Sequence, residues 1–170
     1  MSGPRHSGFG FLIASAAVIV AVGLGACGDS SDSGTTSAEG AYVTAKSLNR
    51  YEPGTPQRTV LQWWKAVQFA DPTVAHGFYA PQRAPRLPEL QHRLAIASNQ
   101  FAGIPDFHSM DVRGNRATVY FFSARPGSSA PPRAVSVNLV RTGKSWALAD
   151  DQLLSQVVER VESASVASSS

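Results

Sequence analysis

Residues 116–124 read RATVYFFSA, and this stretch decides the fold class. Its side chains follow the period of two that is typical of a β-strand. Val119 and Phe121 therefore share one face of the expected strand. Thr118, Tyr120 and Phe122 share the other face. Large side chains on both faces indicate a strand that packs on a core and also presents an apolar side to another layer or partner.

Three neighbouring stretches have the same period and are predicted to be strands: residues 104–112, 134–141 and 145–150. Short turns with a Gly separate the first strand from the second at residues 113–115, and the third from the fourth at residues 142–145. Short connections of this kind join antiparallel strands. We therefore expect an antiparallel sheet of about four strands.

Helical patterns lie before and after these strands. Thr55-Pro56 and Asp71-Pro72 are typical helix starts, because the first residue caps the helix and Pro suits the first helical position. The predicted helices lie within residues 54–71, 72–80, 88–99 and 151–163. Helices followed by strands predict an α+β fold, with N-terminal helices packed on the antiparallel sheet and a helix at the C-terminal end.

Composition excludes several classes of protein. The chain has a formal net charge of +3 and 43% hydrophobic residues, enough for the core of one domain. Its Lys and Arg residues are dispersed, whereas nucleic-acid binding needs a concentrated basic surface. His76, His92 and His108 are too far apart in sequence to form a short metal-binding motif. We expect no nucleic-acid partner, no metal and no cofactor.

The only cysteine, Cys27, follows an uncharged stretch over residues 9–26. A basic start, an apolar stretch and small residues before a cut describe a secretory signal peptide. Leu24, Gly25 and Ala26 directly precede Cys27, and these four residues resemble the lipobox of bacterial lipoproteins. The resemblance implies cleavage before Cys27 and attachment of lipid to its sulfur. An uncleaved membrane helix and an ordinary signal peptide with a chance cysteine remain alternatives.

These features divide the chain into four segments. Residues 1–26 are the predicted signal peptide, and residues 27–49 carry the lipid and form a flexible tether. Residues 50–162 form the folded domain. Residues 163–170, SASVASSS, are predicted to be a disordered tail.

Three stretches resemble the nuclear-transport-factor-2-like superfamily, whose members have a cystatin-like cone fold and include SnoaL-like proteins. They are residues 59–82 (TVLQWWKAVQFADPTVAHGFYAPQ), 115–122 (NRATVYFF) and 137–151 (VNLVRTGKSWALADD). The resemblance implies a curved sheet wrapped around the helices, with a cone-shaped pocket between them. It does not imply one function, because the family contains isomerases, dehydratases, polyketide cyclases and non-catalytic modules.

Aromatic residues dominate the candidate pocket lining, which comprises Trp64, Phe78, Tyr79, His108, Tyr120 and Trp146, with Phe122 and Asn138 as further candidates. Such residues form either a small-molecule site or an ordinary core. The candidate acids and bases are His76, Asp106, His108, Asp111 and Asp150. Asp106 and His108 share one face of a strand, as a base and its orienting group would, and as the outward side of an edge strand also would. We assign no catalytic residue.

Three functional hypotheses follow. The first is a non-catalytic lipoprotein of the bacterial envelope, anchored outside the cytoplasm to the cell membrane through acylated Cys27, that binds an apolar small molecule or an envelope protein. The second is a small secreted isomerase or dehydratase that uses the aromatic pocket. The third is a module that forms a homodimer through the outer side of its sheet.

Overall fold

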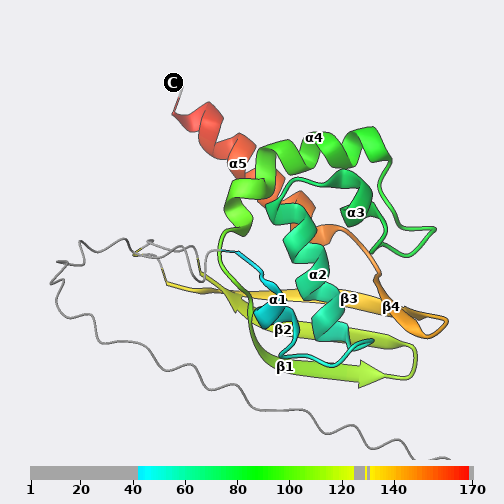
Figure 1. Ribbon diagram of the computed structural model, residues 1–170. Helices are drawn as coiled ribbons and strands as arrows, with labels where there is room; N and C mark the ends of the chain where they lie inside the picture. The colour runs from blue at the N-terminus through cyan, green and yellow to red at the C-terminus, as the bar shows by residue number, and fades with distance from the viewer. Residues whose placement is uncertain (1–41, 125–128, 130, 169–170) are drawn as a thin grey trace, which may run out of the picture. The chain divides into compact units, whose positions relative to one another are not determined.

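The computed structural model describes residues 42–124, 129 and 131–168, which lie within one compact unit, Thr36–Ser170. The helices are α1 (Ala45–Leu48), α2 (Pro56–Gln68), α3 (Pro72–His76), α4 (Leu87–Ala97), the 3₁₀ helix η1 (Ser98–Phe101) and α5 (Gln152–Ala167). The strands are β1 (Asp106–Arg113), β2 (Arg116–Ser123), β3 (Arg133–Thr142) and β4 (Ser145–Leu148). Helices precede the curved antiparallel sheet and α5 follows it, which confirms the predicted α+β fold (Figure 1).

The sheet has the order β1-β2-β3-β4, and each neighbouring pair is antiparallel. Arg113 pairs with Arg116 across the first hairpin, so its turn contains two residues and begins with Gly114. The φ angle of Gly114 is +60°, a conformation that glycine adopts without a steric penalty. The predicted turn is therefore confirmed.

The two edges of the sheet differ from the predicted pattern. In β1 the register shifts between Phe107 and Ser109, which places His108 in a β-bulge. Beyond β4, the amide of Leu148 donates to the carbonyl of Phe78 over 2.8 Å, and the amide of Ala80 donates to the carbonyl of Leu148 over 3.0 Å. The prediction of one helix over residues 72–80 is thus wrong at its end, because this segment leaves α3 and pairs with β4.

The predicted helix starts are confirmed. The Thr55 side chain accepts a hydrogen bond from the Arg58 amide at the start of α2, and Asp71 caps α3 in the same way through the Val74 amide. These caps satisfy amides that have no partner within the helix. Cap chemistry therefore sets both helix starts.

We call the face of the sheet that packs on the helices the inner face and the opposite face the outer face. Val119 and Phe121 lie on the inner face and are buried, and Figure 1 shows α2 crossing over that side of the sheet. Tyr120 and Phe122 lie on the outer face and are each 40% exposed. The predicted alternation along β2 is therefore confirmed.

The folded region extends further at both ends than predicted. Val43 and Ser47 are buried, although the expected tether ran to residue 49, because the Val43 amide donates to the Gln68 side chain over 2.9 Å. At the other end α5 continues to Ala167, into the expected tail. Within this last part of α5, the Ser163 hydroxyl donates a hydrogen bond to the Glu159 carbonyl over 2.7 Å.

In the part of the chain that the structure describes, no helix combines the length and apolar character needed to cross a membrane. The expectations for the signal peptide, for Leu24, Gly25 and Ala26, and for Cys27 concern residues outside the described range.

Candidate functional site

Three of the six candidate pocket residues belong to the packed interior. Trp64, Tyr79 and Trp146 are each at most 5% exposed. The indole N–H of Trp64 donates to the carbonyls of Phe101 and Gly103 over 2.9 and 3.0 Å. The polar atom of Trp64 is thus satisfied by the backbone, and its ring contributes only apolar surface.

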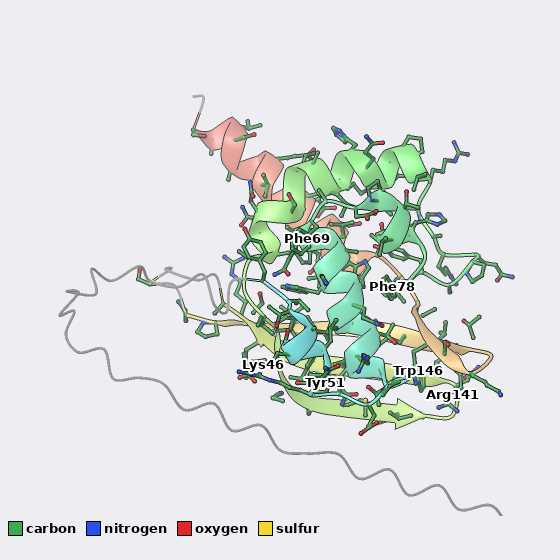
Figure 2. The ribbon with its side chains drawn as sticks, in the orientation of Figure 1. Lys46, Tyr51, Phe69, Phe78, Arg141 and Trp146 are labelled. Carbon is green, nitrogen blue, oxygen red and sulfur yellow. The ribbon has the colours of Figure 1, made fainter. Side chains whose placement is uncertain are left out.

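Trp146 is buried at the part of the core next to the β3–β4 hairpin. Figure 2 shows it beside Arg141 near the β3–β4 hairpin, where the Arg141 guanidinium lies 4.9 Å from the centre of the indole ring. This is a cation–π contact between paired strands, since Arg141 and Trp146 are register partners. Trp146 therefore contributes to the hairpin.

The other three candidates lie elsewhere on the molecule. His108 and Tyr120 are exposed on the outer face, with their ring centroids 6.4 Å apart. Phe78 is half-buried in a shallow apolar groove between α2 and α3, which it shares with Phe69 and Val74. The structure therefore places the six residues in separate regions, because alternation along β2 turns Tyr120 away from the helices that hold Trp64.

The candidate acids and bases also lie outside the interior. Asp106 and His108 share the outer side of the edge strand β1, and both are exposed. Asp111 forms an ion pair with Arg113 at 2.9 Å, and His76 ends α3. Within the described residues, the buried polar side chains are those of Ser47, Thr59 and Gln68, so no carboxylate or imidazole there is buried. The described region also holds no cluster suited to a metal ion.

Edge-to-face aromatic contacts fill the centre of the domain. The Trp63 ring lies 5.7 Å from the Phe101 ring and 6.4 Å from the Tyr79 ring. Among the described groups, neither the Trp63 indole N–H nor the Tyr79 hydroxyl has a hydrogen-bond partner of normal geometry. Burial raises the pKa of Tyr79 far above its usual value, and the adjacent Trp63 N–H opposes part of that rise.

One cleft connects this interior to the surface, and we call it the α5 cleft. It has a volume of about 390 Å³, within the usual range for small-molecule sites. Its lining comes from α2 and η1 (Trp64, Gln100, Phe101), the ends of β2 and β3 (Ser123, Ala124, Pro131, Arg133, Ala134, Val135, Ser136) and α5 (Gln152, Leu153, Gln156, Val157, Arg160). The cleft lies where the inner face of the sheet emerges from beneath the helices.

The inner face of β3 changes character towards this opening. Leu139 and Val137 are buried, Val135 is half-buried, and Arg133 is exposed. Arg133 is the register partner of Ser123, two positions beyond the buried Phe121, so it lies on the same inner face. Strand β3 therefore begins with a cation at the mouth of the cleft.

Helix α5 provides the opposite wall. Gln152, Gln156 and Arg160 recur every four residues and line the cleft together. The helix is held in place by Arg93 of α4, which forms an ion pair with Asp151 and donates to the Ser155 hydroxyl over 3.0 Å. The polar wall is therefore carried by an element fixed to the rest of the domain.

A second cleft, of about 780 Å³, is formed by residues 80–83, the start of β2, the end of β3 and residues 149–150, which follow β4. Thr118 donates to the Asn138 side-chain carbonyl over 3.0 Å, and the Asn138 amide donates to Asp150 over 3.2 Å. Arg83 and Arg116 also line this cleft. Its polar groups bond to one another and its charges are mixed, so it favours no single class of ligand.

Comparison with known proteins finds no match to a protein-family model, to a curated protein or to a solved structure.

Sequence reasoning identified Trp64 as a lining residue but missed Arg133 and Arg160. The spacing of Gln152, Gln156 and Arg160 was a usable signal, because residues four apart share one helix face. Arg133 had no such signal. Its role depends on how far the helices extend over β3, which is a property of the tertiary structure.

Proposed function

We propose that this chain is a lipid-anchored lipoprotein of the bacterial envelope, held outside the cytoplasm on the cell membrane. Its domain, of the nuclear-transport-factor-2-like kind, binds a ligand without transforming it. The Leu24-Gly25-Ala26-Cys27 sequence supports the anchor. A Ser/Gly-rich chain of the length of residues 28–41 has a root-mean-square span of about 20 Å, which keeps the domain near the membrane.

The observation that carries the binding function is the α5 cleft. It brings the Trp64 and Phe101 surface of the interior together with the exposed polar groups of α5. The cleft thus combines a buried apolar floor with a largely polar wall and mouth, and polar groups of this kind fix the orientation of a ligand in small-molecule sites.

The alternative of an isomerase or dehydratase receives no such support. That chemistry needs an acid or base placed against the substrate in a sheltered site. Asp106 and His108 are exposed on the outer face, and the described residues that line the α5 cleft include neither a carboxylate nor an imidazole. The arrangement therefore favours binding over catalysis.

Self-association is a second candidate function, favoured by the outer face of the sheet. Tyr120 and Phe122 are each 40% exposed, and the His108 ring lies 5.2 Å from the Phe122 ring. Exposed aromatic side chains that gather on one surface are typical of protein–protein contacts. A second copy of the chain, or another envelope protein, would cover this face.

The anchor is tested by expressing the full chain in a bacterium with a lipoprotein pathway. We expect wild-type protein in the membrane fraction and an acylated Cys27 peptide by mass spectrometry. Cys27→Ser should abolish both results, and adding Ser30→Cys to that variant should not restore them, because the new thiol lies outside the lipobox. Acylation of the double variant, or an unmodified Cys27 in the wild type, would reject the anchor.

The binding function is tested by native mass spectrometry of the protein purified from its own host. A bound small molecule would support it, a dimer that Phe122→Ser dissociates would support self-association, and a bare monomer would contradict both.

A further inference from the structure

We propose that the α5 cleft recognises small anionic amphiphiles, in which one carboxylate or phosphate group is joined to an apolar chain. This inference rests on the proposed binding function and specifies its ligand. The ligand's anionic group would lie between Arg133 and Arg160, and its apolar chain would extend towards Trp64 and Phe101.

The charge of the cleft supports this class of ligand. Arg133 comes from the sheet and Arg160 from α5, so two separate elements supply cations to one opening. The lining residues that the structure describes include no Asp or Glu. Neither guanidinium forms a hydrogen bond or an ion pair with any other described residue, so no acidic group in the described part of the chain neutralises either cation.

The other charged groups of the region do not neutralise these two cations. Asp151 forms its ion pair with Arg93, and Asp150 accepts a hydrogen bond from Asn138. Guanidinium groups hydrogen-bond carboxylates and phosphates in a forked geometry, and these charge-assisted bonds are stronger than neutral ones. The amides of Gln152 and Gln156 add neutral donors on the same wall.

The floor explains why the ligand needs an apolar part. Trp64 and Phe101 line the cleft with their ring centroids 4.5 Å apart, and Val157 and Leu153 lie on the wall of α5. The Trp64 N–H is already bonded to two carbonyls, so the ring offers no free donor to a polar ligand. Trp64 and Phe101 are almost completely buried, so the apolar surface that a ligand chain would remove from water belongs to the half-buried Val135 and Leu153 and the exposed Ala134, which a free anion would leave uncovered.

The test uses the unit Thr36–Ser170, which contains all the described helices, strands and core residues, after cooperative unfolding has been verified. Calorimetry below micelle-forming concentrations compares laurate and lauryl phosphate with lauryl alcohol, dodecyltrimethylammonium and inorganic phosphate. We expect the two anionic amphiphiles to bind most tightly, with an affinity that falls as salt is added. Quenching of tryptophan fluorescence should accompany binding, because Trp64 forms the floor.

Charge-removing variants provide the second arm. Arg133→Gln and Arg160→Gln should each weaken laurate binding about tenfold, the effect of losing a charge-assisted hydrogen bond. Arg86→Gln is the matched control, since Arg86 is exposed before α4 and does not line the cleft. It should leave the affinity unchanged.

Equal binding of lauryl alcohol, unchanged laurate affinity in both cleft variants, or no binding of any amphiphile would each overturn the inference. A neutral molecule found on the host-purified protein would reject this ligand class while leaving the binding function intact. Binding of inorganic phosphate as tight as that of lauryl phosphate would reject the role of the apolar floor.

Discussion

Phe121 and Phe122 are neighbours on β2, yet the strand places them in different surroundings. Phe121 is 1% exposed on the inner face, with its ring 5.5 Å from that of Trp64 and 5.4 Å from that of Phe107. Phe122 is 40% exposed on the outer face, where its ring meets His108. The same side chain therefore stabilises the core at one position and remains available for contacts at the next.

Alanine substitution at these two positions gives the largest expected contrast. Phe121→Ala should lower the free energy of unfolding by about 3–5 kcal/mol, because it removes a ring from a packed cluster and leaves a cavity. Phe122→Ala should cost about 1 kcal/mol, since much of its surface already contacts water. Urea denaturation with equal m-values measures both. Similar losses for the two variants would contradict the assignment of the faces.

The interior also depends on one buried amide. Gln68 accepts from the Val43 amide over 2.9 Å and donates to the carbonyls of Phe101 and Gly103 over 2.8 Å each. Gln68→Leu should cost about 1–3 kcal/mol, because the Val43 amide loses its partner. Trp64 still donates to both carbonyls, so the damage should centre on the N-terminal segment.

Hydrogen exchange at Val43 measures this local effect, which we expect as faster exchange in Gln68→Leu. Gln62→Leu is the control, because Gln62 lies on the same helix and is only half-buried. Unchanged protection at Val43 would show that the N-terminal segment is held by packing alone.

The fold was largely predictable because its signals are local. Thr55 and Asp71 cap their helices through nearby amides, and the period of two along β2 separates Phe121 from Phe122. The bulge at His108 was not predictable, since it depends on the pairing of β1 with β2. The burial of Val43 was missed for the same reason, because its partner Gln68 lies far along the chain.

The candidate site was less predictable than the fold. The sequence indicates pocket residues only by their aromatic type, yet Tyr120 and Trp64 lie on opposite sides of the sheet. The α5 cleft depends on how α5 packs on β3. No local sequence pattern in either element predicts that packing. Arg133 resembles any other surface arginine until that packing is known.

A smaller effect is expected on the outer face near β4. Asn138 links Thr118 to Asp150 through hydrogen bonds of 3.0 and 3.2 Å. Asn138→Ala should lower the free energy of unfolding by about 1 kcal/mol, the usual net value of partly exposed hydrogen bonds. Ser136→Ala, on the same face and strand, should change it by less than about 0.5 kcal/mol. An equal loss in both variants, measured by thermal unfolding, would show that the hydrogen-bonded chain is not stabilising.

The smallest effect at neutral pH is expected for Tyr79→Phe. Its buried hydroxyl has no hydrogen-bond partner of normal geometry within the described residues, so its removal should change the free energy of unfolding by less than about 0.5 kcal/mol. Above about pH 10 the free energies of unfolding of wild type and Tyr79→Phe should differ. Burial raises the pKa of Tyr79, so the folded protein keeps this proton while the unfolded chain releases it. The free energy of unfolding of the wild type should therefore fall as the pH rises, because of Tyr79.

This loss begins at the unfolded pKa of about 10 and amounts to about 1.4 kcal/mol per pH unit, until the folded pKa is reached. Tyr79→Phe lacks that contribution, so its stability relative to wild type should increase as pH rises above about 10. Tyr120→Phe on the outer face retains Tyr79 and should keep the alkaline loss. Urea denaturation below and above that pH measures the difference. If the free energy of unfolding changed with pH in the same way for wild type and Tyr79→Phe, the Tyr79 phenol would have to be in contact with water. That result would contradict the burial that separates Tyr79 from the exposed Tyr120.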